Sequence, residues 1–402
     1  MSAAAPGGVV LVLNSGSSSL KYSLLESGSG DVLASGAVEQ IGESSGRLTH
    51  RGLDGTQRVE REFADHEDAL RAVLDAFEDH GPVLSQVGLA AIGHRVVHGG
   101  PRFSEPVRIE DDVVAAIEEL VPLAPLHNPA NLEGIRTAGR LFPGLPQVAV
   151  FDTAFHRSLP EAASTYAIPL SLRDEHQIRR YGFHGTSYAF VCREAARFLG
   201  RPLEELNLVV LHLGNGASAA AVRGGRSVET SMGITPLEGL VMGTRSGDVD
   251  PALHGHLHRE LGWSADEVDR VLNHESGLKG LAGVNDLRLV LERRDGGDDD
   301  ARLALDVFCH RLKKYVGAYY AVLGTVDAVV FTAGIGEHAA AVRAESLSGL
   351  ERLGISVDPA RNDQHVEGPF SISPDSSAVA VLVVPTNEEW EIARQTMAVL
   401  RD

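Results

Sequence analysis

Two short turns rich in glycine and serine carry side chains that could bind a phosphate. The first turn, residues 14–19, follows an apolar run and stands just before Lys21. Small residues let backbone N–H groups approach an oxyanion, and a lysine supplies positive charge. The second turn, residues 214–218, follows a similar run that ends at His212 and Leu213. Either turn alone could be an ordinary surface hairpin, but the two together favour a site that grips a polyphosphate from both sides.

A third glycine turn, residues 334–338, follows an apolar run and opens a helical pattern. Free N–H groups and the helix dipole make such a turn an anion site. Gly334, Gly336 and Ala339 also fit the dinucleotide pattern G-x-G-x-x-A, although no βαβ partner is evident after them. The pattern G-x-x-x-x-G-K-[ST] does not occur, so the sequence excludes a Walker-type nucleotide site.

Charged side chains stand beside glycines or at the ends of apolar runs. Arg95 and Arg245 carry planar guanidinium groups, whose forked donors suit a carboxylate or a phosphate. Asp152 follows a run that ends at a position where α/β proteins usually bind ligands. Each of them could instead serve only a structural ion pair, so the sequence alone leaves both interpretations open.

Histidines are placed in two notable ways. His184 lies between glycines, ahead of a helix that we expect to be capped near Thr186 or Ser187. A lone histidine is more often structural than functional. The alternating histidines at 254–258 follow an expected helix start, where a spacing of two residues does not place all three on one face. We therefore expect no metal site there.

Composition and charge exclude several classes of protein. The chain has 402 residues and a net charge of −19, whereas coating nucleic acid or binding anionic membranes needs a basic face. Cys192 and Cys309 are its only cysteines, too few for a disulfide framework or a cysteine-based zinc site. The start has no basic signal region, and no apolar run approaches the roughly 20 residues of a membrane span. We expect a cytoplasmic protein without nucleic-acid or membrane partners.

Alternating strands and helices must position these groups. Apolar runs predict strands at 9–13, 20–25, 32–38, 89–97, 147–151, 208–213, 219–222, 227–230, 326–331 and 378–384. Helical periodicity appears at 67–80, 111–120, 128–141, 187–199, 264–272, 299–323 and 387–401. The alternation indicates an α/β protein with mostly parallel connections. The charged stretch 292–300 is expected to be a solvated loop.

The first two turns lie in two copies of one strand–turn–strand–strand unit. Asn14 aligns with His212, and Gly16 with Gly214. Although two glycine-rich hairpins could match by chance, the shared element order favours an internal duplication.

These segments together resemble the acetate kinase family. The resemblance covers residues 9–390 and rests on NSGSSSLKY (14–22), GHRVVHGG (93–100), FDTAFH (151–156), GFHGTS (182–187), HLGNG (212–216), MGTRSGD (242–248), FTAGIGE (331–337) and TNEE (386–389). It implies an α/β fold with two duplicated ribonuclease H-like domains, the actin-like ATPase fold, and an interdomain cleft that closes on substrate. The N-terminal domain is then expected at 1–156 plus 388–402, and the C-terminal nucleotide-binding domain at 157–387.

The resemblance also implies the roles of individual residues. Asn14 and Glu388 would hold Mg²⁺. The nucleotide-binding residues would be Lys21, His212, Leu213, Gly214, Asn215, Gly216, Asp286, Leu287, Arg288, Gly334, Ile335, Gly336, Glu337 and His338. Arg95 would orient the acyl substrate, with an apolar methyl pocket formed by Val97, Leu126, Phe183 and Pro236. Asp152 matches the active-site aspartate, while His184 and Arg245 would stabilise the transferring phosphoryl group. Leu287 and His338 depart from the family, which often has phenylalanine and asparagine there.

The implied reaction is reversible phosphoryl transfer from ATP to acetate, giving acetyl phosphate and ADP, with Mg²⁺ or a substituting Mn²⁺. A homodimer is implied as well. The sequence leaves three alternatives: a propionate or butyrate kinase on the same scaffold, a conformational ATPase like Hsc70 or actin, and a nicotinamide dehydrogenase built on Gly334 and Gly336. The conformational ATPase is disfavoured because a chaperone needs neither Arg95 nor Arg245.

Overall fold

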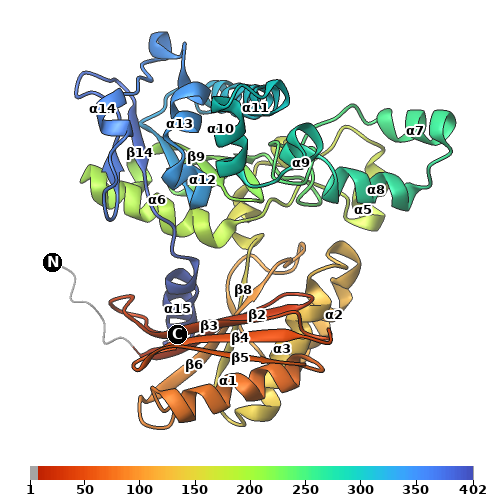
Figure 1. Cartoon of the computed structure of the whole chain (residues 1–402), viewed down its shortest axis with the longest axis vertical. Helices are drawn as coiled ribbons and strands as arrows, with labels where there is room; N and C mark the ends of the chain where they lie inside the picture. Colours follow the sequence, from red (N-terminus) through yellow and green to blue (C-terminus); the bar gives the residue numbers. More distant parts are fainter. Residues whose placement is uncertain (1–7, 402) are drawn as a thin grey trace. The chain divides into compact units, whose positions relative to one another are not determined.

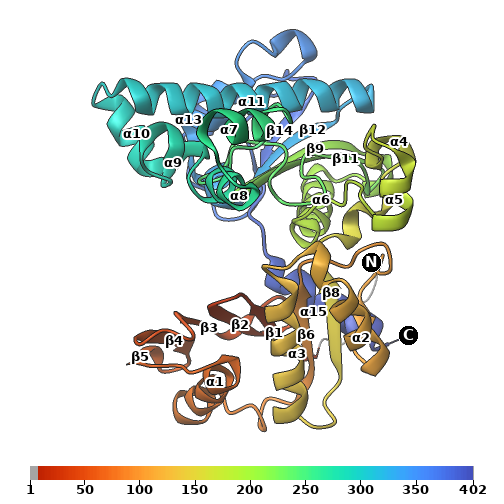
Figure 2. The ribbon, with the colours of Figure 1, turned by 90° about the vertical axis from the view of Figure 1, so that its right-hand side faces the viewer.

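Two β-sheets organise residues 8–401, the part of the chain that the computed structural model describes. The first sheet lies in unit 1, which runs to Phe155 and resumes at Asn387, and the second lies in unit 2, His156–Thr386 (Figures 1 and 2). The expected division into 1–156 with 388–402 and 157–387 differs from these bounds by one residue at each boundary.

Unit 1 contains an eight-stranded mixed sheet in the order β5-β4-β3-β2-β1-β6-β8-β7. Its strands are β1 (Val9–Ser15), β2 (Ser19–Glu26), β3 (Val32–Glu39), β4 (Gly46–Gly52), β5 (Gly55–Arg61), β6 (Leu89–Val96), β7 (Val107–Arg108) and β8 (Gln147–Phe151). Its helices are α1 (His66–His80), α2 (Asp111–Glu119), η1 (Val121–Leu123), α3 (Asn128–Leu141) and α15 (Glu388–Val399), and η2 (Ala154–Ser158) crosses into unit 2.

Unit 2 contains a six-stranded sheet in the order β11-β10-β9-β12-β14-β13. Its strands are β9 (Asn207–Leu213), β10 (Ala217–Arg223), β11 (Arg226–Thr230), β12 (Ala328–Thr332), β13 (Phe370–Ser371) and β14 (Ala380–Val383). Its helices are α4 (Glu161–Ser164), α5 (Leu170–His176), α6 (Gly185–Leu199), η3 (Leu203–Glu205), α7 (Leu253–Leu261), α8 (Ala265–His274), α9 (Gly277–Ala282), α10 (Leu287–Asp295), α11 (Asp299–Leu323), α12 (Ala333–His338), α13 (Ala340–Leu347), η4 (Glu351–Leu353) and α14 (Pro359–Asn362).

The two sheets repeat one topology. The order β3-β2-β1-β6-β8-β7 in unit 1 matches β11-β10-β9-β12-β14-β13 in unit 2, with parallel and antiparallel pairs at the same places. Asn14 pairs with Lys21 one step before the first turn, and His212 pairs with Ser218 one step before the second. The predicted duplication and its alignment of Asn14 with His212 are therefore confirmed.

Helices cover both faces of each sheet. In β1, Leu11 and Leu13 pack in the core with residues of α1, whereas Val10 and Val12 pack with Ile392 of α15. This division follows from the alternation of side chains along a strand. In unit 2, α11 and α6 lie on opposite faces of the sheet, and the side chain of Val210 in β9 is fully buried (Figure 2). Strands covered on both faces are expected to carry apolar runs, as residues 208–211 of β9 do.

The structure corrects two expectations about secondary structure. Residues 292–300 are mostly helical, because α10 ends at Asp295 and α11 begins at Asp299 with the Asp298 carboxylate capping it. The hairpin β4–β5 was not predicted from the sequence, since most side chains of β5 are exposed and give no apolar run.

Two other sequence expectations concern cysteines and membrane spans. Cys192 and Cys309 are buried free thiols. Over residues 8–401, no helix combines the length and apolar character needed to cross a membrane.

Candidate active site

Unit 1 gathers charged side chains at the carboxyl ends of its parallel strands. Arg95 lies near the end of β6, and Asp152 directly follows β8. Arg95 Nε donates to Asp152 Oδ1 at 3.0 Å and Nη2 donates to Oδ2 at 2.5 Å. Only 21% of the Arg95 side chain and 2% of the Asp152 side chain are exposed. The two-point contact fixes the plane of the guanidinium group.

Glu388, in the first turn of α15, belongs to the same charged group of unit 1. Burial raises the pKa of Glu388 to about 7; Arg95 and Lys21 oppose that rise, while Asp152 and Glu389 add to it. Lys21 is the cross-strand partner of Asn14, and its side chain is exposed. The charges of Lys21, Arg95 and Asp152 therefore all act on the Glu388 carboxyl group.

Two of the residues expected in a methyl pocket belong to unit 1. The Val97 side chain is half-buried in the segment after β6, whereas Leu126, between η1 and α3, is 65% exposed. The residues of unit 1 therefore do not enclose the Leu126 side chain in an apolar pocket.

Two buried asparagines that sequence reasoning missed hold the segment after β6. Asn131 Oδ1 accepts from the Val97 N–H at 3.0 Å, and its Nδ2 donates to the Ser15 carbonyl at 2.7 Å. Asn128 exchanges two hydrogen bonds with the backbone of His98. The residue type could have indicated their role, because asparagine is unfavourable on the buried face of a helix unless it has a specific hydrogen-bond partner.

His184 of unit 2 has a strained backbone. It precedes α6 in the left-handed region, with φ 59° and ψ 24°, which a non-glycine residue adopts only when its surroundings enforce it. Its Nδ1 lies 2.8 Å from Ser218 Oγ, which in turn lies 2.6 Å from the Tyr188 hydroxyl. Its ring stacks on His212, with centroids 4.1 Å apart. These contacts fix the orientation of the imidazole.

The expected cap of α6 was wrong. His184 occupies the N-cap position, and α6 starts at Gly185 instead of after Thr186 or Ser187. Ser187 lies inside the helix, where its hydroxyl is 2.8 Å from His212 Nδ1 and 2.8 Å from Thr386 Oγ1. The serine therefore serves as a partner of His212.

The turn between β9 and β10 brings His184 and Arg245 together. A Cβ atom added to Gly216 would lie 3.4 Å from Arg245 Nη1 and 3.8 Å from His184 Nε2. Arg245 Nη1 also donates to the Pro236 carbonyl at 3.4 Å, and burial lowers the pKa of this arginine. Among residues 8–401, no carboxylate lies within ion-pair distance of Arg245. An arginine and a histidine thus converge on a glycine turn without a neutralising acid.

A cavity of about 510 Å³ in unit 2 joins three segments that the sequence singled out separately. Its volume lies in the usual range for a small-molecule site. The cavity is lined by Gly214, Asn215, Asn285, Asp286, Leu287, Arg288, Leu291, Gly334, Ile335, His338 and Ala339. Asn285, Leu291 and Ala339 were not predicted, because each becomes a wall residue only when segments distant in the sequence come together around the cavity.

Other expected nucleotide-binding residues lie beside this cavity without lining it. His212, Leu213 and Gly216 belong to the β9–β10 hairpin. Gly336 is buried within α12, and the Glu337 carboxylate accepts from the Thr386 N–H at 3.1 Å. The segment containing Glu337 is thus attached to the last residue of unit 2.

The cavity wall has a defined polar edge. Asp286 caps α10 and accepts a forked pair of bonds from the exposed Arg288. Leu287 is buried, whereas His338 is exposed at the end of α12. Gly334 has open space around its Cα, so a ligand can approach the backbone there.

Comparison with known proteins agrees with this arrangement. The sequence profile of the acetokinase family matches residues 9–394. An acetate kinase of Streptomyces avermitilis is 60% identical over 395 residues, covering 97% of each chain. The crystal structure of acetate kinase from Porphyromonas gingivalis has a TM-score of 0.94 and 43% identity, covering 98% of this chain and 100% of that one.

A propionate kinase from Francisella tularensis is similar to nearly the same degree, with a TM-score of 0.92 and 42% identity over 98% of this chain and 100% of that one. Both the duplicated actin-like fold and the resemblance inferred from the sequence segments are confirmed by these matches. The chain belongs to the acetokinase family.

Proposed function

We propose that this chain catalyses reversible phosphoryl transfer from ATP to acetate, giving acetyl phosphate and ADP. The observation that carries the proposal is the convergence of Arg245 and His184 Nε2 on the Gly216 turn, without a carboxylate to neutralise the arginine. Phosphoryl transfer needs positioning and charge stabilisation and little covalent work by the protein. An unneutralised guanidinium beside a fixed imidazole suits the charge on the equatorial oxygens.

The cavity of unit 2 is our candidate adenosine site. Its walls hold apolar side chains, the Asp286–Arg288 pair and the open backbone at Gly334. The adjoining turn at Gly214 and Gly216 would then receive the phosphates through backbone N–H groups.

Arg95 is our candidate for binding the carboxylate of acetate. Acetate resembles the aspartate carboxyl group, whose pKa is about 4, so it is ionised at pH 7 and needs no base. Asp152 would orient Arg95 through its two hydrogen bonds and would not abstract a proton. An Asp152→Asn variant should lose kcat, because it lacks this charged fork; near-wild-type kcat at every metal concentration would reject the role.

The oxygen donors of unit 1 fit Mg²⁺, which prefers one or two carboxylates together with substrate phosphates. Asn14 and Glu388 would hold the ion, and the acidic field of Asp152 and Glu389 at Glu388 is suited to a cation. When bound, Mg²⁺ neutralises charge on the phosphate oxygens. Mn²⁺, which also accepts oxygen ligands, is expected to substitute.

The test is a hydroxamate assay with ATP and Mg²⁺ that compares acetate, propionate and butyrate. Acetyl hydroxamate with the highest kcat/KM supports the proposal. A preference for propionate would keep the mechanism and change the substrate, as the similarity to the Francisella tularensis propionate kinase requires us to consider. Acyl phosphate from none of the acids would reject an acyl site and favour a conformational ATPase.

The homodimer implied by the resemblance and the cytoplasmic location expected from the sequence pattern remain predictions. Sedimentation of the purified chain would test the dimer, and fractionation of cells would test the location.

A further inference from the structure

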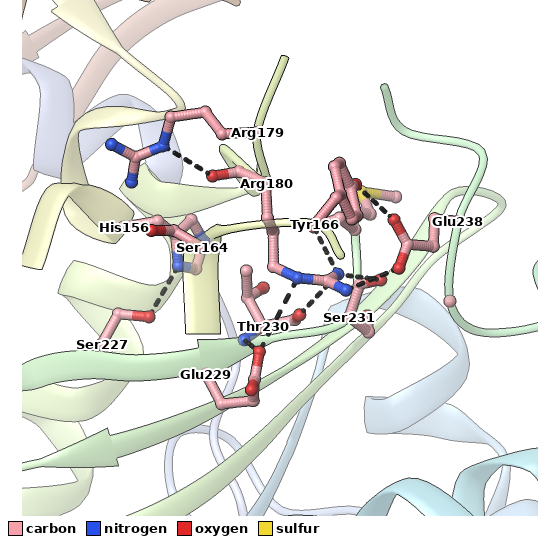
Figure 3. A network of polar contacts seen from close by, with 12 residues as sticks. His156, Ser164, Tyr166, Arg179, Arg180, Ser227, Glu229, Thr230, Ser231 and Glu238 are labelled. Carbon is pink, nitrogen blue, oxygen red and sulfur yellow. Dashed lines mark hydrogen bonds and ion pairs between the residues drawn. The ribbon is translucent and has the colours of Figure 1, made fainter. Parts of the chain in front are cut away.

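A partly buried cluster of polar side chains in unit 2 connects two loops that carry expected pocket residues. The cluster consists of Tyr166, Arg180 and Glu238, and we call these three residues the clamp (Figure 3). The sequence analysis did not single out any of them.

Arg180 is the centre of the clamp. Its Nη2 donates to Glu238 Oε1 at 2.5 Å, and its Nη1 lies 3.0–3.2 Å from the carbonyls of Thr230, Ser231 and Met232. Only 16% of its side chain is exposed. Figure 3 shows the guanidinium group lying between Glu238 and the end of the strand that carries Thr230. Such a directed set of donors fixes the start of the following loop.

Tyr166 completes the clamp from the other side. Its hydroxyl donates to Glu238 Oε2 at 2.5 Å and accepts from the Ile234 N–H at 3.0 Å. Burial raises the pKa of Tyr166, and Glu238 raises it further, so the group remains a hydroxyl donor. A side chain at Gly233 would clash with both the Tyr166 hydroxyl and the Glu238 carboxylate. The Gly233 backbone therefore packs closely against both side chains.

The loops held by the clamp are those of the expected active site. Arg180 stands three residues before Phe183, and the N–H groups of Tyr181 and Gly182 both donate to the Gly233 carbonyl. Ile234 and Glu238, each held by Tyr166, stand on either side of Pro236. The carbonyl of Pro236 accepts from Arg245.

We propose that Tyr166, Arg180 and Glu238 are positioning residues that set the spacing of Phe183 and Pro236, and thereby the length of carboxylic acid that the site accepts. This inference rests on the proposed function, in which Phe183 and Pro236 contact the alkyl group of the acid. One methylene in an apolar pocket changes discrimination by about 10- to 200-fold. A small displacement of Pro236 is therefore measurable as a change in substrate preference.

The principal variant is Tyr166→Phe, which removes one hydroxyl and keeps the ring. Glu238→Gln and Arg180→Lys test the other two members. For each variant, kcat/KM is measured with acetate, propionate and butyrate, together with the KM for ATP and the melting temperature. The propionate-to-acetate ratio of kcat/KM should change by at least about fivefold, while the KM for ATP changes by less than about twofold, because the adenosine cavity has no clamp residue in its lining.

The matched control is Tyr315→Phe. The Tyr315 hydroxyl donates to Asp248 Oδ2 at 2.8 Å, so this variant also removes a tyrosine–carboxylate hydrogen bond from unit 2. It should lower the melting temperature and leave the ratio unchanged.

An unchanged ratio in folded Tyr166→Phe overturns the proposal, and so does an equal shift in Tyr315→Phe, which would indicate general loosening. The proposed function fails separately, if the wild-type chain itself forms no acyl phosphate.

Discussion

The two units differ in chemistry at corresponding positions of one repeated sheet. Leu13 pairs with His94 in unit 1, and its counterpart Leu211 pairs with Phe331 in unit 2. Extending this register by one residue makes Arg95 of unit 1 equivalent to Thr332 of unit 2. In the neighbouring strand the same register relates Asp152 to Thr386. A buried ion pair in unit 1 thus corresponds to two neutral threonines in unit 2.

This difference separates position from chemistry. The shared backbone places side chains at the carboxyl ends of parallel strands, where α/β proteins bind ligands. Unit 1 uses that edge for charges that are already paired. Unit 2 uses it for helix α12, which begins directly after Thr332, and receives its positive charge from Arg245 in a loop outside the sheet. The duplication therefore preserves the backbone positions at this edge of the sheet and not the side chains that occupy them.

The largest expected effect comes from breaking the ion pair of unit 1. Arg95→Ala removes the guanidinium group that makes two hydrogen bonds to the buried Asp152 carboxylate. Removing one partner of a buried ion pair costs about 3–5 kcal/mol of the free energy of unfolding. Chemical denaturation measures this loss. Adding Asp152→Asn should recover much of the stability without restoring activity, and an Arg95→Ala chain as stable as the wild type would contradict the interpretation.

Removing the unpaired arginine of unit 2 should act on the reaction instead. Arg245→Ala removes the donor that we propose to stabilise the transferring phosphoryl group, so kcat should fall about 10²- to 10³-fold. Stability should change less than in Arg95→Ala, because no carboxylate is left unpaired. Arg201→Ala, which breaks the exposed Arg201–Asp327 ion pair of the same unit, is the control and should keep kcat. Equal losses of kcat in Arg245→Ala and Arg201→Ala would contradict a specific role of Arg245 in the reaction.

The third effect concerns His94, whose counterpart is Phe331. Burial lowers the pKa of His94 to about 4, with an opposing contribution from its hydrogen bond to Gln147. The unfolded chain then binds a proton more readily below about pH 6.5, so stability falls as the pH drops from there towards 4. At pH 5 the expected loss in the free energy of unfolding is about 2 kcal/mol. His94→Phe should flatten that part of the stability–pH curve; an unchanged slope would assign it to other groups.

The smallest effect is expected at the exposed edge of the unit 2 cavity that we propose to bind adenosine. His338 lines the cavity, but its side chain lies largely in solvent. His338→Asn, the residue common in the family, should change the KM for ATP by only about two- to threefold, which corresponds to well under 1 kcal/mol. Comparing ATP with GTP in both proteins measures the contribution to base preference. A tenfold change would show that His338 selects the base.

Much of the architecture could be predicted from local patterns in the sequence. Strands such as β9 give continuous apolar runs, and the glycine turns repeat, so the duplication follows from the residue pattern alone. The hairpin β4–β5 could not be predicted in this way, because β5 is largely exposed and its pairing depends on β4.

The expected site residues divide in the same way. Residues next to glycines or at strand ends, such as Arg95 and His184, could be found from sequence. Asn131, Leu291 and Arg180 could not, since their roles depend on partners distant in the chain. Leu126 was selected by resemblance, and its 65% exposure leaves its role as a proposal.

The last helix of the chain also determines when each unit can be completed during synthesis. Ile392 and Ala393 of α15 fill the core that Val10 and Val12 of β1 begin, so the first strand made must wait for the last helix. Domains usually fold in order from the N-terminus, but here unit 2 is one continuous segment and unit 1 is not. The nascent chain therefore exposes an apolar face of its first sheet until α15 has been made. A chain truncated before residue 388 would contain all of unit 2 and would leave this face of the first sheet without the helix that covers it.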